Sequence, residues 1–193
     1  MECGDGVTTT TQECWRNEAA HDHARVLERC ALTVQFEDNI WQNASSWEEY
    51  CQTLARLSAG RGDESCLRVL HELGCSLAVA KAGDFFATVA DLAAARGHGG
   101  CLRVLHELGG DEAASVAAAD AKGHTPAFHA ALGGHEGSLR VLHELGGDAA
   151  ASVAVADANG DTPAHMAAMG GHGGFLRVLH ELGGDAAASV TAA

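Results

Sequence analysis

Apolar residues recur along the chain in a pattern that repeats four times. The string Leu-Arg-Val-Leu-His-Glu-Leu-Gly begins at Leu67, Leu102, Leu139 and Leu176, so consecutive copies lie 35, 37 and 37 residues apart. Within each copy the leucines are three residues apart, a spacing that places them on one face of a helix. The closing glycine is typical of a helix C-terminus. A helix that returns at this period indicates a stack of similar units.

A second, shorter helix is predicted before each copy, most clearly in the last unit. Asp157-Ala158-Asn159-Gly160 is a turn sequence, because Asp and Gly accept unusual backbone angles. Thr162 then stands where an N-cap residue is favoured, and Pro163 stands at the first helical position. The pattern predicts a helix over 163–169, a glycine pair, and a second helix over roughly 174–182.

These units resemble the ankyrin repeat, whose first helix opens with Thr-Pro-Leu-His-x-Ala. The fourth unit carries the resemblance through Thr162-Pro163-Ala164-His165-Met166-Ala167-Ala168 and the third through Thr125-Pro126-Ala127-Phe128-His129-Ala130-Ala131. In the third unit, phenylalanine stands where the family has histidine, and histidine follows one place later. The second unit has Val89 for Pro and Asp91 for His, and the first unit is recognised mainly by its register.

The resemblance implies an all-α fold, an ankyrin-type helix-turn-helix solenoid with short extended hairpin-like connections called fingers. We expect the array to cover 46–193, in units of about 46–80, 81–119, 120–156 and 157–193. The later units exceed the usual ankyrin length of roughly 33 residues. Alignment places four extra residues within 146–153, where we expect longer or irregular fingers.

The two ends of the chain depart from the repeat. Residues 1–45 are expected to form a capping helix or a poorly ordered segment, and a decayed repeat is the alternative. Ser46 with Glu49 predicts a capping box at the start of the array. The last unit is as apolar as the internal ones and stops at Ala193, which favours a fragment of a longer array.

Composition narrows the possible partners. The chain has 12 basic and 26 acidic residues, a formal charge of −14, and no basic stripe, so nucleic-acid binding is not expected. The acidic surface favours a partner with a basic segment. No apolar run is long enough to cross a bilayer, so membrane insertion is not expected. Seven cysteines, odd in number and without a Cys-x-x-Cys pair, predict reduced thiols and a cytoplasmic protein.

The twelve histidines are explained mostly by repetition. One set occupies the second helix and is expected to form a partly exposed column (His71, His106, His143 and His180). The resemblance implies that a second set forms hydrogen-bonding struts between units (His98, His135, His165 and His172). Equivalent side chains in neighbouring units are about 10 Å apart, too far to share a zinc ion. We therefore expect no metal site and no cofactor. The sequence shows no nucleophile with a recognisable base nearby, so we do not expect an enzyme.

The resemblance implies a function in binding another protein through a concave groove, without catalysis, and we expect a monomer. Carried over by position, the finger tips and inner helices would supply the contacts: Asp91, Arg96, Lys122, His124, His129, Leu132, Asn159, Asp161, Met166 and Met169. The alternative is a regulatory or targeting segment of a larger enzyme or channel, because ankyrin arrays are often attached to such proteins.

Overall fold

The computed structural model describes residues 20–21, 24, 26, 42–77, 88–110, 115–147 and 152–183. Within these ranges it contains only helices: α3 (Trp47–Arg61), α4 (Glu64–Glu72), α5 (Val89–Ala95), α6 (Gly99–Leu108), α8 (Pro126–Gly133), α9 (Glu136–Leu145), the 3-10 helix η1 (Ser152–Ala154), α11 (Pro163–Met169) and α12 (Gly173–Leu182). The predicted all-α solenoid is therefore confirmed. Most of the predicted N-terminal segment, 1–45, lies outside the described residues.

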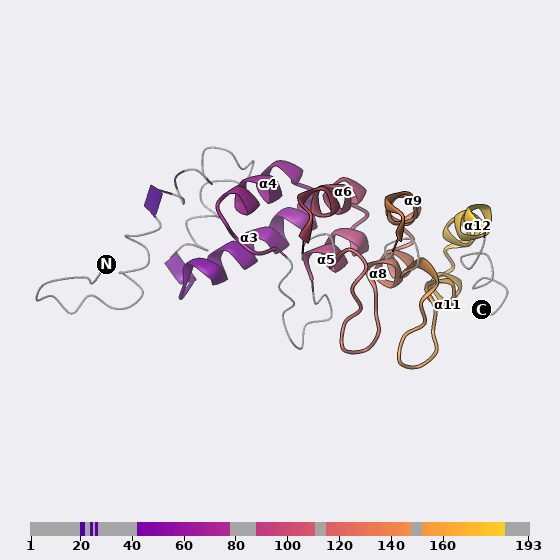
Figure 1. Cartoon of the computed structure of the whole chain (residues 1–193). Coiled ribbons are helices and arrows are strands. Elements are labelled where there is room, and N and C mark those ends of the chain that lie inside the picture. The colour runs from indigo at the N-terminus through magenta and orange to yellow at the C-terminus, as the bar shows by residue number, and fades with distance from the viewer. Residues whose placement is uncertain are drawn as a thin grey trace, which may run out of the picture.

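The helices form two parallel rows (Figure 1). In the first row, α3 contacts α5, α5 contacts α8, and α8 contacts α11; we call these the inner helices. In the second row, α4 contacts α6, α6 contacts α9, and α9 contacts α12. Two long loops project on the side of the inner row, one before α8 and one before α11 (Figure 1). These loops are the fingers of the third and fourth units.

Local sequence sets the helix starts as predicted. The Thr125 hydroxyl accepts a hydrogen bond from Phe128 N at 3.3 Å, and the Thr162 hydroxyl accepts one from His165 N at 3.4 Å. Proline follows each threonine at the start of α8 and α11. At the start of α3, Ser46 Oγ accepts a hydrogen bond from Glu49 N at 3.1 Å. The Glu49 carboxylate accepts from Ser45 N at 2.8 Å, one residue before the amide that the predicted capping box would use. The predicted helix over 163–169 matches α11, and its partner α12 begins one residue earlier than expected.

The core follows the leucine pattern. The first leucine of each copy of the repeated string is fully buried at 67, 102 and 139, and half-buried at 176 in the last unit. Across the unit boundaries the inner helices meet through small buried residues: Ala90, Ala93, Ala94, Ala127, Ala130, Ala131, Ala164 and Ala167. Small side chains allow neighbouring helix backbones to approach closely, so each unit shields the apolar side of the next.

The inserted residues do not simply lengthen the fingers. The described end of the insertion, Ser152–Ala154, forms the 3-10 helix η1, which contacts α8, α9 and α11. Val153 within it is fully buried. Of the two expectations, longer or irregular fingers, these residues fit an irregular connection, because an apolar side chain gains more from packing between units than from exposure. Residues 148–151 lie outside the described ranges.

The cysteines also depart from expectation. Cys51 in α3 and Cys75, three residues beyond α4, form a disulfide with their Cα atoms 5.8 Å apart. The prediction of reduced thiols is therefore wrong for this pair, because the fold brings together two cysteines that are 24 residues apart in sequence. The cysteine pattern consequently no longer supports a reducing compartment. Cys101 is a free thiol, and burial is the main reason that its pKa rises to about 12.

Recurring histidines connect the units as predicted. The Nε2 atoms of His98, His135 and His172 lie 3.2, 2.8 and 3.1 Å from backbone oxygens of the preceding unit, those of Gly60, Ala95 and Leu132. The predicted role of His165 is corrected, because its Nδ1 accepts a hydrogen bond from Thr162 N in its own capping box. The histidine column on the second helix of each unit is partly exposed, as expected (His71, His106, His143 and His180).

A ladder of ion pairs accompanies the struts on the second row. Three of the four arginines of the repeated string meet a glutamate one unit further along, in the pairs Arg68–Glu107, Arg103–Glu144 and Arg140–Glu181. These side chains are about half exposed, so each pair contributes less than about 1 kcal/mol to stability. The ladder mainly favours one register between neighbouring units.

Candidate functional site

The ten residues predicted to contact a partner divide into two groups. Five are exposed: Arg96, Lys122, Leu132, Asn159 and Met169. Asp161 is half-buried, and four are buried: Asp91, His124, His129 and Met166. We use the name finger face for the surface carried by the first five residues together with Val155 and Asp161.

Burial changes the role of two of the predicted contacts. Asp91 is 1% exposed, and its carboxylate accepts a hydrogen bond from Thr88 N at 2.8 Å, which completes the capping box of α5. Met166 is 8% exposed and packs in the core of the fourth unit. The Asp91 side chain caps its own helix and the Met166 side chain lies in the core, so in this structure neither is presented to a partner.

The finger turns hold their tip residues in a fixed arrangement. Asp120 Oδ1 accepts hydrogen bonds from Lys122 N and His124 N, both at 2.8 Å. Asp157 Oδ1 does the same for Asn159 N and Asp161 N at 2.8 Å. Such side-chain bonds to the following backbone are typical of turns that begin with aspartate.

Successive fingers are also bonded to each other. Ala158 N donates to Lys122 O at 2.8 Å, a bond from the tip of the fourth unit to the tip of the third. Lys122 and Asn159 occupy the same place in their turns, 37 residues apart, and both side chains are exposed. The finger face is therefore a repeated, backbone-anchored surface.

Large apolar side chains are also exposed on the inner helices and before the fourth finger turn. Leu132 near the end of α8 is 40% exposed, and Met169 at the end of α11 is 80% exposed. These residues are again 37 positions apart and hold equivalent places in their helices. Val155, two residues before the fourth finger turn, is 43% exposed.

Two predicted contacts, His124 and His129, instead form a buried cluster with Asp120. Their exposed fractions are 8% and 0%, and Phe128 stacks on the His124 ring with centroids 4.3 Å apart. His124 Nδ1 lies 3.2 Å from Asp120 Oδ2, and its Nε2 lies 3.6 Å from Asp157 Oδ2. The prediction that these two histidines contact a partner is therefore corrected, because both rings are buried and pack beside Asp120, Asp157 and Phe128.

The electrostatics of this cluster follow from burial and backbone hydrogen bonds. Burial is the largest cause that lowers the pKa of His129, to about 4, with the neighbouring His124 adding to it. Burial works against ionisation of Asp120, but the amides of His124 and Lys122 more than offset it and lower the pKa of that carboxyl. At neutral pH the cluster therefore contains a carboxylate and a neutral, buried imidazole.

Sequence reasoning missed this cluster, although a signal was present. The histidines at 98, 135 and 172 and those at 71, 106, 143 and 180 recur in equivalent places, whereas His124 and His129 do not. In the fourth unit the equivalent positions hold Asp161 and Met166. The signal for this cluster was therefore that its two histidines do not recur at the equivalent positions of the fourth unit.

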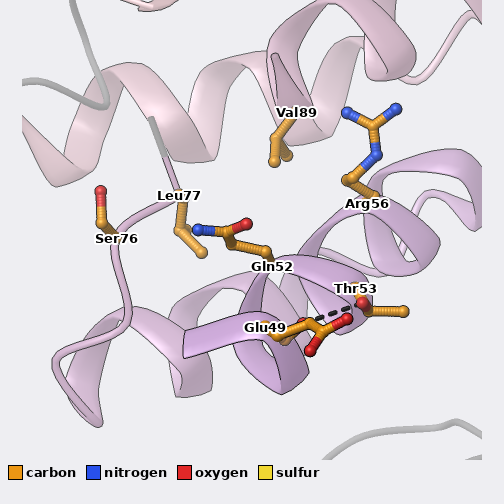
Figure 2. Close-up of a pocket in the computed structure, with 7 residues that line it drawn as sticks. All are labelled: Glu49, Gln52, Thr53, Arg56, Ser76, Leu77 and Val89. Atoms are coloured by element: carbon orange, nitrogen blue, oxygen red, sulfur yellow. Dashed lines mark hydrogen bonds between the residues drawn. The ribbon is translucent and has the colours of Figure 1, made fainter. Parts of the chain in front are cut away.

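A small cleft lies elsewhere, beside α3 (Figure 2). Its volume is about 110 Å³, and it is lined by Glu49, Gln52, Thr53, Arg56, Ser76, Leu77 and Val89. Thr53 Oγ1 donates to Glu49 O at 2.8 Å, so part of its polar lining is satisfied within α3. Ligand-binding pockets usually measure about 300–1,000 Å³, so we assign no function to this cleft.

The geometry defines a helical repeat protein of the solenoid class, with stacked helix pairs and projecting finger turns. A family model of ankyrin repeats, in three copies, matches residues 90–190, more than half of the chain. The chain therefore belongs to the ankyrin repeat family, as the resemblance predicts. Ankyrin repeats generally act as protein-binding modules and are typically not catalytic. A search of curated proteins finds no match to this sequence.

Among the described residues, no helix combines the length and the apolar character that crossing a membrane would require.

Proposed function

We propose that this chain is a non-catalytic module that binds another protein through its finger face. The proposal is supported by the predicted contact residues that are exposed in the structure. Arg96, Lys122, Leu132, Asn159 and Met169 remain exposed, and they come from three successive units. A surface distributed in this way engages a partner over several units at once.

The observation that carries the proposal is the exposure of large apolar side chains. Among the described residues, Leu132, Val155 and Met169 are the large hydrophobic residues that are exposed. Leu132 and Met169 hold equivalent places in α8 and α11, which contact each other. Apolar side chains exposed on neighbouring elements are typical of protein–protein contacts. Methionine in addition adapts its shape to a partner.

Rigidity supports affinity at this face. The finger turns are closed by carboxylate-to-amide hydrogen bonds, and Ala158 N donates to Lys122 O between fingers. A surface that is already ordered loses less conformational entropy when it binds. The partner would therefore dock on a preformed surface.

Charge sets the expected chemistry of the partner. The formal charge of −14 attracts a basic segment over long range, which raises the rate of encounter. On the finger face itself, Arg96 and Lys122 are basic and Asp161 is acidic. The attraction of a basic segment therefore comes from the overall charge of the chain, and the finger face itself supplies contacts to an apolar patch of the partner.

The test is comparative affinity capture followed by mass spectrometry. The full chain, the L132S/M169S variant and the H106S/H180S variant are used as bait under the same conditions. His106 and His180 are exposed on the second row, so their substitution is the matched control. We expect the wild type and the control to retain one set of proteins that L132S/M169S loses, and higher salt to weaken that capture. Retention by L132S/M169S, or equal loss by the control, would contradict the finger-face assignment.

A further inference from the structure

Asp120, His124 and His129 each offer one ligand atom within 4.8 Å of the others. Asp120 is half-buried, and both histidines are buried. One carboxylate oxygen and two imidazole nitrogens form a donor set that zinc uses in proteins. We propose that these three residues bind a zinc ion at the base of the third finger. This site is separate from the proposed binding of a partner protein.

Two of the ligand atoms already have the spacing that zinc requires. Asp120 Oδ2 and His124 Nδ1 are 3.2 Å apart. Two ligands at roughly 2.0–2.1 Å from a tetrahedral ion lie about 3.3 Å from each other. The other carboxylate oxygen, Oδ1, accepts the amides of Lys122 and His124, which fixes the orientation of Oδ2 toward the ring. The fold therefore already places two of the three proposed ligand atoms at the separation that zinc requires.

His129 supplies the third ligand from the first turns of α8. Its ring is fully buried beside the His124 ring, with centroids 5.8 Å apart and the planes at 77°. Its ligand nitrogen lies within 4.8 Å of the ligand atoms of Asp120 and His124. Tetrahedral zinc brings ligand atoms to about 3.3 Å from one another, so a change in the side-chain torsions of His129 would complete the site. Phe128 stacks on His124 and holds that ring in position. Binding would therefore leave the backbone of the finger unchanged.

A carboxylate behind the His124 ring supports the same assignment. Asp157 Oδ2 lies 3.6 Å from His124 Nε2, and its side chain is 2% exposed. With Nδ1 bound to the ion, Nε2 carries the ring proton and faces this carboxylate. Histidine ligands usually donate their second N–H to such a group, which fixes the tautomer and orients the ring. Because Asp157 belongs to the next unit, the ion would tie two finger turns together.

The repeat itself does not require this arrangement. The equivalents of Asp120, His124 and His129 in the fourth unit are Asp157, Asp161 and Met166, and Leu92 takes the place of His129 in the second. Those units form the same helix start without two histidines. The cluster is consequently a feature of the third unit alone, and its substitutions can be copied from neighbouring units that fold.

The test uses the full chain, stripped with a chelator and then titrated with Zn²⁺ by calorimetry. Co²⁺ serves as a spectroscopic probe, because its visible absorption reports tetrahedral nitrogen and oxygen ligands. We expect one ion per chain and a rise in melting temperature on binding. The H129L variant, which copies Leu92 of the second unit, should bind at least about a hundredfold more weakly, since changes behind a ligand already cost about 10–100-fold. The D157N variant should lose about tenfold.

Two further variants keep the result decisive. H124A tests a second ligand, with the alanine that the second unit has at residue 87, and H106Q changes an exposed histidine of the second row. Circular dichroism in the presence of chelator checks that each variant is folded. Wild-type affinity in H129L and H124A, weakening in H106Q that equals theirs, or no stoichiometric binding by the wild type would overturn the proposal and leave the cluster as a packing contact.

Discussion

Gly97 gives the sharpest test of how neighbouring units are fastened. It follows α5 with φ +80°, and a Cβ atom at this position would lie 2.8 Å from His135 Nδ1. The same ring reaches Ala95 O through Nε2 at 2.8 Å. Substitution by alanine therefore strains the backbone and also pushes the strut away from its acceptor. Gly171 holds the equivalent place in the last unit, with φ +72° and nothing within 4 Å of such a Cβ atom.

The two glycines separate strain from steric conflict. A left-handed conformation costs an alanine roughly 1–2 kcal/mol, and this cost applies to both G97A and G171A. G97A carries an additional overpacking cost of about 1–3 kcal/mol, because the His135 ring must move and its hydrogen bond weakens. We therefore expect G97A to lower the free energy of unfolding by about 2–5 kcal/mol and G171A by about 1–2 kcal/mol.

Urea unfolding, followed by circular dichroism, measures both values. A repeat array can fray at its end, so the comparison is completed by a double-mutant cycle of G97A with H135A. Without the imidazole ring, the additional cost of G97A should disappear. Equal costs of G97A in the wild-type and H135A backgrounds, within about 0.5 kcal/mol, would refute the steric argument.

Four further predictions test the packing, the caps and the thiols. T125A removes the N-cap of α8 and should lower the free energy of unfolding by about 0.5–2 kcal/mol in urea, with no change meaning that the cap is dispensable. L142A empties a fully buried site and should cost about 2–5 kcal/mol, whereas a cost below about 1 kcal/mol would contradict that burial. The disulfide closes a loop of 24 residues, so C51A/C75A should lose about 3 kcal/mol, and an unchanged urea midpoint would argue against the bond in solution. The pKa of Cys101 is raised from 9.0 to about 12, so the thiol of the unfolded chain ionises first as the pH rises. The free energy of unfolding should therefore fall between pH 9 and pH 12. C101A should reduce this slope, and an identical pH profile in C101A and the wild type would exclude the effect.

Local signals allowed the helices to be predicted closely. Thr162, Pro163 and the glycine pair are short-range signals, because capping and turn geometry depend on residues a few positions apart. They predicted α11 at both ends, and Ser46 with Glu49 predicted the start of α3. The struts of His98, His135 and His172 required more than local reasoning, and the resemblance to a known repeat supplied it.

Positions covered by a neighbouring unit could not be predicted in the same way. Asp91 and His129 belong to the face that carries contacts in the repeat pattern, yet their burial depends on the caps and fingers that fold over them. His165 differs from the other recurring histidines because its nearest hydrogen-bond partner is the capping residue three positions earlier. The disulfide depends on the distance between α3 and the segment that follows α4, which no sequence spacing specifies.

The histidine struts and the arginine–glutamate pairs join equivalent positions from one unit to the next, so the molecule can be shortened by a whole unit. Excision of residues 98–134 would connect Gly97 to His135 and shift everything beyond by 37 places. His172 would then face the carbonyl of Ala95, and Glu144 would face Arg68. Each junction would be rebuilt from parts that already fit. The histidines at 124 and 129 would be replaced by Asp161 and Met166. A shortened chain of this kind would keep the contacts that fasten one unit to the next, and it would lose the cluster of Asp120, His124 and His129.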